Sequence, residues 1–93
     1  MKYKINNSDK SIEYNGEVLY IPRKEFLILS YLQENPNRII SREEFIGNIW
    51  EKDVVVLPRT IDVHIRKIRK RFPNAPIKSR RCYGYFWKSD ILQ

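Results

Sequence analysis

The chain is organised around residues 59–72, RTIDVHIRKIRKRF. The apolar residues of this stretch recur in steps of four, three and four positions, which places them on one side of an α-helix. They are Ile61, Ile65, Ile68 and Phe72. At about 100° per residue, the opposite side carries Arg59, Val63, Arg66, Lys67 and Lys70. One face can therefore pack in a core while the other presents positive charge to a polyanion.

Positive charge is concentrated in the last third of the sequence. Residues 59–88 contain ten Lys and Arg against the single acid Asp62, a net charge of +9, whereas the other residues sum to −2 and the whole chain to +7. Such a one-sided distribution is typical of a nucleic-acid-binding domain. A length of 93 residues suits one small domain, so we expect residues 1–93 to fold as a single unit.

The composition excludes several classes of protein. Cys82 is the only cysteine, so no internal disulfide can form, and with a single histidine the chain lacks a set of zinc ligands. The longest apolar runs, such as 26–29 and 54–57, have four residues, too few to cross a membrane. The N-terminus has no signal-peptide hydrophobic region. These features predict a cytoplasmic protein with no metal or other cofactor.

Residues 2–21 predict small antiparallel strands. Asn15-Gly16 favours a two-residue type I′ turn, because both positions tolerate positive φ. This turn would join strands 11–14 and 17–20 and set Ile12 opposite Leu19. A further, weaker strand is expected at 2–5.

A helix is expected from Pro22 to about Glu34. The fixed φ of proline suits a helix start, and Asn35-Pro36-Asn37 predicts the helix end, because the residue before a proline is pushed out of the α region. The inward side of this helix would carry Phe26, Ile28, Leu29 and Leu32/Gln33.

A second helix is expected after Ser41. Residues 38–40 are short and β-branched and predict a single strand before it. Ser41 and Glu44 have the spacing of a capping box, in which the Ser side chain accepts from the N–H of Glu44 and the Glu side chain reaches back in return. The inward residues of the helix would be Phe45, Ile46, Ile49 and Trp50.

The segments flanking the basic stretch differ in character. Residues 54–57, VVVL, are apolar for a loop, so they either pack against the core or form an exposed patch for a protein partner. Residues 73–76, PNAP, predict a turn, and 77–81 and 85–88 predict a hairpin with Arg80 and Arg81 near its tip. The predicted order β-β-β-α-β-α-α-β-β, with a basic last helix and a basic hairpin, is an α+β winged helix-turn-helix arrangement.

These residues resemble the OmpR/PhoB-type winged-helix DNA-binding domains of bacterial response regulators. Residues 59–70, RTIDVHIRKIRK, carry the most specific part of the resemblance, because they match the recognition helix of that family. The resemblance extends over nearly the whole chain, through Glu25-Phe26, Ile28-Leu29, Ser41-Arg42-Glu43-Glu44, Trp50, Ile77 and Gly84-Tyr85.

The resemblance implies a four-stranded N-terminal antiparallel sheet, three helices and a C-terminal β-hairpin wing. It also implies sequence-specific double-stranded DNA binding for transcription regulation, within a two-component system. Residues 59–72 would enter the major groove, and the wing, residues 77–88, would reach the adjacent minor groove. The expected DNA-binding residues are Arg59, Thr60, Val63, His64, Arg66, Lys67, Arg69 and Lys70 in the helix and Ser79, Arg80 and Arg81 in the wing.

Partners and context follow from the same resemblance. Loop 51–58 matches the segment that such proteins use to touch RNA polymerase, and two copies would bind head to tail as a dimer on direct repeats. No receiver domain precedes residue 1, so we expect either an excised effector domain or a free-standing regulator.

The sequence departs from the family pattern at four positions. The family usually has a hydroxyl residue at Pro22, often a polar cap at Pro58, an apolar residue at Arg80 and glycine at Cys82. The last two changes bear on the turn geometry and contacts of the wing, and leave its positive charge in place.

Different side chains would attract the DNA and read it. Lys, Arg and Thr60 would bind phosphates, which gives salt-dependent affinity. Lys67 and Arg66 are the first candidates for base contact, since Lys and Arg bond guanine O6 and N7, and Val63 could touch a thymine methyl. Arg81 would favour a narrow, A·T-rich minor groove.

Two flanking residues of the helix have weaker roles. His64 is expected as a neutral phosphate contact or as a packed side chain. Asp62 is expected to restrain a neighbouring arginine.

Other functions compete with operator binding. The wing aromatics Tyr83, Tyr85, Phe86 and Trp87 could stack on single-stranded bases. The positive charge alone would also suit a non-specific nucleic-acid binder. The apolar loop, residues 54–57, would suit a protein-interaction module. An enzyme is not expected, because the sequence has no glycine-rich phosphate loop, metal cluster or pair of catalytic carboxylates.

Overall fold

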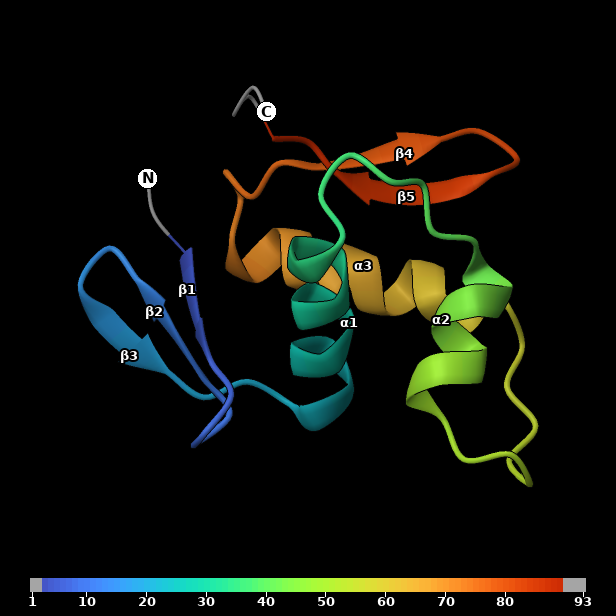
Figure 1. Cartoon of the computed structure of the whole chain (residues 1–93), viewed down its shortest axis with the longest axis horizontal. Helices are drawn as coiled ribbons and strands as arrows, with labels where there is room; N and C mark the ends of the chain where they lie inside the picture. The colour runs from blue at the N-terminus through green and yellow to red at the C-terminus, as the bar shows by residue number, and fades with distance from the viewer. Residues whose placement is uncertain (1–2, 90–93) are drawn as a thin grey trace.

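The computed structural model describes residues 3–89 and contains five strands and three helices in the order β-β-β-α-α-α-β-β. Figure 1 shows the N-terminal sheet at one end, α2 at the other, α1 and α3 between them, and the C-terminal hairpin along the top of the view. The elements are β1 (Tyr3–Asn6), β2 (Ser11–Tyr14), β3 (Glu17–Leu19), α1 (Arg23–Glu34), α2 (Arg42–Ile49), α3 (Arg59–Arg71), β4 (Ile77–Arg80) and β5 (Gly84–Trp87).

The N-terminal sheet has the predicted hairpin. Asn15 and Gly16 adopt φ of 51° and 86°, and the turn sets Ile12 opposite Leu19. The strand predicted at 2–5 is β1, which starts at Tyr3 and pairs with β2; Lys2 lies outside the described residues. The third strand ends at Leu19, one residue earlier than expected.

The four-stranded sheet implied by the family resemblance is wrong for the described part of the chain, where the sheet has three strands in the order β1-β2-β3. Residues 7–10 form a turn, in which Lys10 has φ of 60°. After β3 the chain runs directly into Pro22, whose ring nitrogen cannot donate to a ladder.

The strand predicted at residues 38–40 is also wrong. Only Ile40 pairs, through an isolated bridge to Tyr85 of β5. Asn37 has φ of 63° and the Arg38 N–H bonds the Asn35 carbonyl, so the chain is still turning there. Because Ser41 caps α2 immediately afterwards, there is room for one bridge and no ladder.

The helix starts follow the prediction only in part. Pro22 has ψ of 146° and stands just before α1, which begins at Arg23. The Ser41 side chain accepts from the Glu44 N–H at 3.0 Å, as a capping box requires. Glu44, however, bonds Arg38 and Tyr31 instead of reaching back to Ser41, so the second half of the box is absent.

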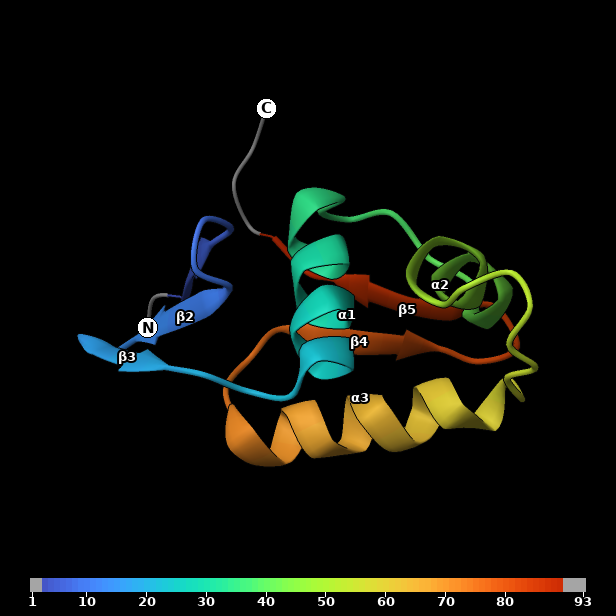
Figure 2. The same cartoon turned by 90° about the horizontal axis from the view of Figure 1, so that it is seen from below.

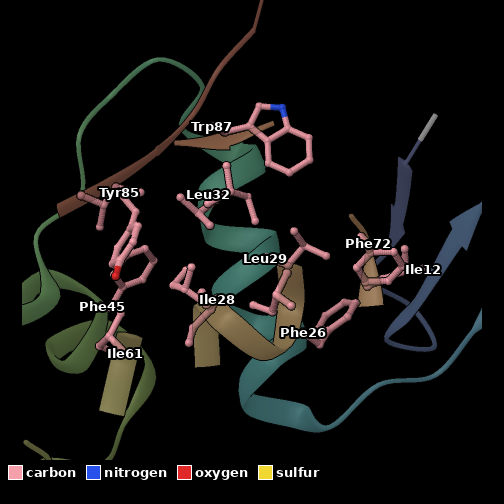
Figure 3. Close-up of a cluster of buried hydrophobic side chains, with 14 residues drawn as sticks. Ile12, Phe26, Ile28, Leu29, Leu32, Phe45, Ile61, Phe72, Tyr85 and Trp87 are labelled. Atoms are coloured by element: carbon pink, nitrogen blue, oxygen red, sulfur yellow. The ribbon is translucent and has the colours of Figure 1, made fainter. Parts of the chain in front are cut away.

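One core joins the three helices to both sheets (Figure 3). The four apolar residues of the basic stretch are buried as their spacing predicted, with Phe72 just past the end of α3. Tyr3 of β1 meets Phe72 and Trp87 edge-on, at 5.7 and 5.8 Å between ring centroids. From α1 and α2 the core takes Phe26, Ile28, Leu29, Leu32 and Phe45, while Gln33, Ile46, Ile49 and Trp50 are half-buried.

Residues 54–57 form an exposed loop. Val54 and Leu57 are exposed and Val55 is 93% exposed, whereas Val56 is half-buried. Of the two alternatives for this segment, the structure has the exposed one.

Candidate nucleic-acid interface

The recognition-helix candidate α3 lies along one edge of the molecule. In Figure 2 the other described elements stand on one side of α3, and its opposite side faces outward. Ile61, Ile65 and Ile68 anchor the inner side. The exposed outer side holds Arg59, Val63, Arg66, Lys67 and Lys70, while Thr60, His64 and Arg69 are half-buried at its margins.

The outer cations are not neutralised within the protein. Among residues 3–89, ion pairs are formed by Lys24, Arg38, Arg42 and Arg71, and by none of the exposed cations of α3 apart from Arg71. The single acid of α3, Asp62, accepts from Arg42 Nε at 2.8 Å. Asp62 therefore restrains a neighbouring arginine, as expected, and the outer face keeps its positive charge. Such a face attracts a polyanion.

His64 is held at the edge of this surface. Its ring stacks on Trp50, with centroids 5.7 Å apart and an interplanar angle of 26°. Burial lowers the pKa of His64 below its usual value of 6.5, and Lys67 and Lys24 add to this, against an opposing effect of Glu25. At neutral pH the imidazole is therefore uncharged, and its Nδ1 is buried without a hydrogen-bond partner in the described structure.

The β4–β5 hairpin brings a second group of the predicted residues near the same surface. Ser79, Arg80 and Arg81 are all exposed. The Arg80 guanidinium lies 5.5 Å from the centre of the Tyr83 ring. Cys82 occupies the turn with φ of 71°, the left-handed conformation that favours the glycine usual in the family.

Two wing aromatics are unavailable for stacking on bases. Tyr85 and Trp87 are 6% and 8% exposed and belong to the core. Tyr83 is exposed and Phe86 is half-buried. A single-strand platform would need several exposed rings in a row, so the geometry argues against it.

Arg69 differs from the other predicted contacts, because its guanidinium already donates to groups of the hairpin. Its Nη2 donates to the Ile77 carbonyl at 3.0 Å and to Ser79 Oγ at 3.1 Å. Its guanidinium also lies 5.6 Å from the centre of the Tyr85 ring. Arg69 therefore joins α3 to the hairpin.

Sequence reasoning missed the residues that support the site. Tyr85 donates a short hydrogen bond to Asp62 Oδ1, and Arg42 lies 5.4 Å from the Tyr85 ring centre. Glu25, buried in α1, accepts from Arg71 Nε at 2.7 Å. One signal was present: a Tyr on the inward side of a strand needs a partner for its hydroxyl. The partner's identity depends on tertiary packing.

Known proteins identify the fold. Residues 16–87 match the family model described as "Transcriptional regulatory protein, C terminal". The chain belongs to this family. Its members are OmpR/PhoB-type winged-helix DNA-binding domains of response regulators, which regulate transcription by sequence-specific DNA binding and are not enzymes.

Individual relatives agree with this assignment of the winged-helix domain. The heme response regulator HssR of Staphylococcus epidermidis is 35% identical over 85 residues, which cover 87% of this chain and 38% of HssR. The response regulator DrrB of Thermotoga maritima, an OmpR/PhoB homologue, is 33% identical with a TM-score of 0.80, over 94% of this chain and 42% of DrrB. The chain thus spans about a third of the length of the curated relatives it matches.

A third comparison concerns the fold alone. The DNA-binding domain of the response regulator AdeR, solved in complex with an intercistronic region, is 23% identical with a TM-score of 0.82, over 94% of each chain.

None of the helices between residues 3 and 89 is both long and apolar enough to span a bilayer.

Proposed function

We propose that the winged-helix domain binds an operator in duplex DNA with α3 in the major groove and the β4–β5 hairpin at the adjacent minor groove. The observation that carries this proposal is the division of α3 into a buried isoleucine stripe and an outer face whose cations have no acidic partner in the described structure. Major-groove width suits one α-helix, and the exposed side of α3 is the side free to enter.

The outer residues divide by position. Arg59 and Lys70 stand near the ends of the helix and would bind phosphates, which fix the register of the protein on the duplex. Val63, Arg66 and Lys67 occupy its middle and would contact base edges. Arg81 at the hairpin turn would enter a narrow minor groove, where the negative potential is strongest.

Loop 51–58 supports a second interaction. Val55 is almost fully exposed, and Val54 and Leu57 are also exposed. Exposed apolar residues that lie close together mark protein-binding surfaces, and RNA polymerase is the partner that the family suggests. Head-to-tail pairing on direct repeats and a cytoplasmic location complete the proposal.

The proposal is tested by selection from random duplex DNA followed by affinity measurements at several salt concentrations. We expect a short repeated motif, with log K falling against log salt at a slope of about −0.9 per phosphate neutralised. Salt-dependent binding without an enriched motif would refute operator recognition. A preference for single strands would refute the duplex geometry.

A further inference from the structure

The β4–β5 hairpin is attached to α3 at two separate points. At one point the Tyr85 hydroxyl bonds Asp62 Oδ1, and at the other Arg69 Nη2 bonds Ile77 O and Ser79 Oγ. Asp62 and Arg69 are seven residues apart on the helix, or about 10 Å along its axis. One attachment would let the hairpin pivot, whereas two attachments at this separation define its angle to α3.

The first attachment is reinforced from α2. Arg42 Nε donates to the same Asp62 oxygen that receives the Tyr85 hydroxyl. Burial, followed by the bond to Asp62, raises the pKa of Tyr85, so the phenol is a neutral donor at physiological pH. A buried hydroxyl that loses its hydrogen-bond partner destabilises the folded state, which favours a single arrangement of the three groups.

Each attachment includes one residue of the same cross-strand pair, and the bond from Arg69 to Ile77 O lies two residues away along β4. Ser79, which accepts from Arg69, stands directly opposite Tyr85 in the β4–β5 register. Arg80, the next residue, ends β4, and the exposed turn with Arg81 follows at residues 81–83. Any rotation at the Ser79–Tyr85 pair would therefore move the guanidinium of Arg81 relative to the outer face of α3.

We propose that Asp62, Arg69 and Tyr85 are positioning residues that set the angle of the hairpin and thereby couple its minor-groove contact to the major-groove contacts of α3. None of the three needs to touch DNA for this role. The inference rests on the proposed function, since it assumes that both elements bind the same duplex.

The chain contains a matched control for this arrangement. The Tyr31 hydroxyl donates to Glu44 Oε2 at 2.6 Å, and Arg38 donates to both oxygens of the same carboxylate. The same chemistry thus links α1 to α2, through side-chain bonds that include no residue of α3 or of the hairpin. Tyr31→Phe and Tyr85→Phe each remove one phenol hydroxyl from a Tyr–carboxylate–Arg set.

The first test uses the DNA-free domain. Residual dipolar couplings and amide relaxation measured by NMR report the orientation and mobility of residues 80–84 relative to α3. We expect Tyr85→Phe to change both quantities and Tyr31→Phe to leave them as in the wild type. Unchanged hairpin couplings in folded Tyr85→Phe would overturn the inference. Asp62→Ala removes the acceptor that the same set shares and replaces Tyr85→Phe if that variant fails to fold.

The second test uses two versions of the selected operator, with A·T or G·C pairs at the wing position. We expect the wild type to prefer A·T, and both Arg81→Ala and Tyr85→Phe to lower this preference at least about threefold. Because both substitutions act through the same minor-groove contact, the double variant should lose little more of the A·T preference than either single variant does. Tyr31→Phe should keep the wild-type preference.

The outcomes separate the inference from the function on which it rests. If the wild type binds the operator but shows no A·T preference, the wing contact fails and the coupling fails with it. If the wild type shows the preference and folded Tyr85→Phe retains it, the positioning role alone is overturned.

Discussion

At the scale of single residues, Lys67 and Lys70 separate base reading from phosphate attraction. Both are exposed on the outer side of α3, Lys67 near its middle and Lys70 in its last turn. We predict that Lys67→Ala lowers the preference for the operator over scrambled duplex by about 1–3 kcal/mol. Lys70→Ala should weaken both complexes alike and reduce the salt slope by about one. Dissociation constants at several salt concentrations measure both effects; equal losses from the two variants would contradict the assignment.

We predict that the positive φ of Cys82 lowers the stability of the folded domain. With φ of 71° it holds a Cβ in the left-handed region, and glycine removes that penalty of about 1–2 kcal/mol while adding entropy to the unfolded chain. Cys82→Gly should therefore raise the melting temperature by a few degrees. Cys82→Ala is the control, because alanine removes the thiol and keeps the Cβ. Equal stabilisation by alanine would show that the thiol, not φ, was responsible.

His64 predicts the pH dependence of stability near neutrality. Its pKa is below 6.5 in the folded state, so between about pH 7 and the folded pKa the unfolded chain binds more protons. The free energy of unfolding should therefore fall as pH drops through this window. His64 is the only histidine, so its NMR titration is unambiguous. His64→Gln should flatten the curve there; an unchanged slope would assign it to another group.

At the scale of elements, the sequence-based predictions were correct where the geometry of a segment depends only on its own residues. The Asn15-Gly16 turn determined the register of β2 and β3, and the isoleucine spacing gave the inner face of α3. The prediction failed at residues 38–40, where a distant strand offers only one pairing position. The outer cations of α3 could be identified from periodicity, whereas the engagement of Arg69 with the hairpin depended on packing between segments.

Two glycines give opposite predictions for the same substitution. A Cβ at Gly84 would lie 2.0 Å from the Ile40 carbonyl oxygen, and its φ is 144°. Gly84→Ala should therefore destabilise the fold by about 3 kcal/mol or more, because it would break the β-bridge between Tyr85 of β5 and Ile40, which precedes α2. Gly47 in α2 has open space around it, and Gly47→Ala should stabilise by about 1 kcal/mol. Thermal unfolding measures both; a stable Gly84→Ala would contradict the close approach.

At the scale of the whole molecule, we propose that residues 1–93 unfold as one cooperative unit. The core joins both sheets and all three helices, which leaves no part with a separate core among the described residues. Trp50 reports on α2 and α3, and Trp87 reports on the root of the hairpin. In Trp50→Phe the remaining indole fluorescence should change at the same denaturant concentration as the far-ultraviolet circular dichroism. Separate midpoints would indicate two folding units.

The edge-on contact of Tyr3 with Trp87 has a consequence for synthesis on the ribosome. It closes the core with residues from opposite ends of the chain, and contacts of such sequence separation slow folding, because the intervening loop must close first. The outer face of α3 is supported by this core. We therefore expect that a nascent chain whose α3 has left the exit tunnel lacks a finished DNA-binding surface until β5 has also emerged.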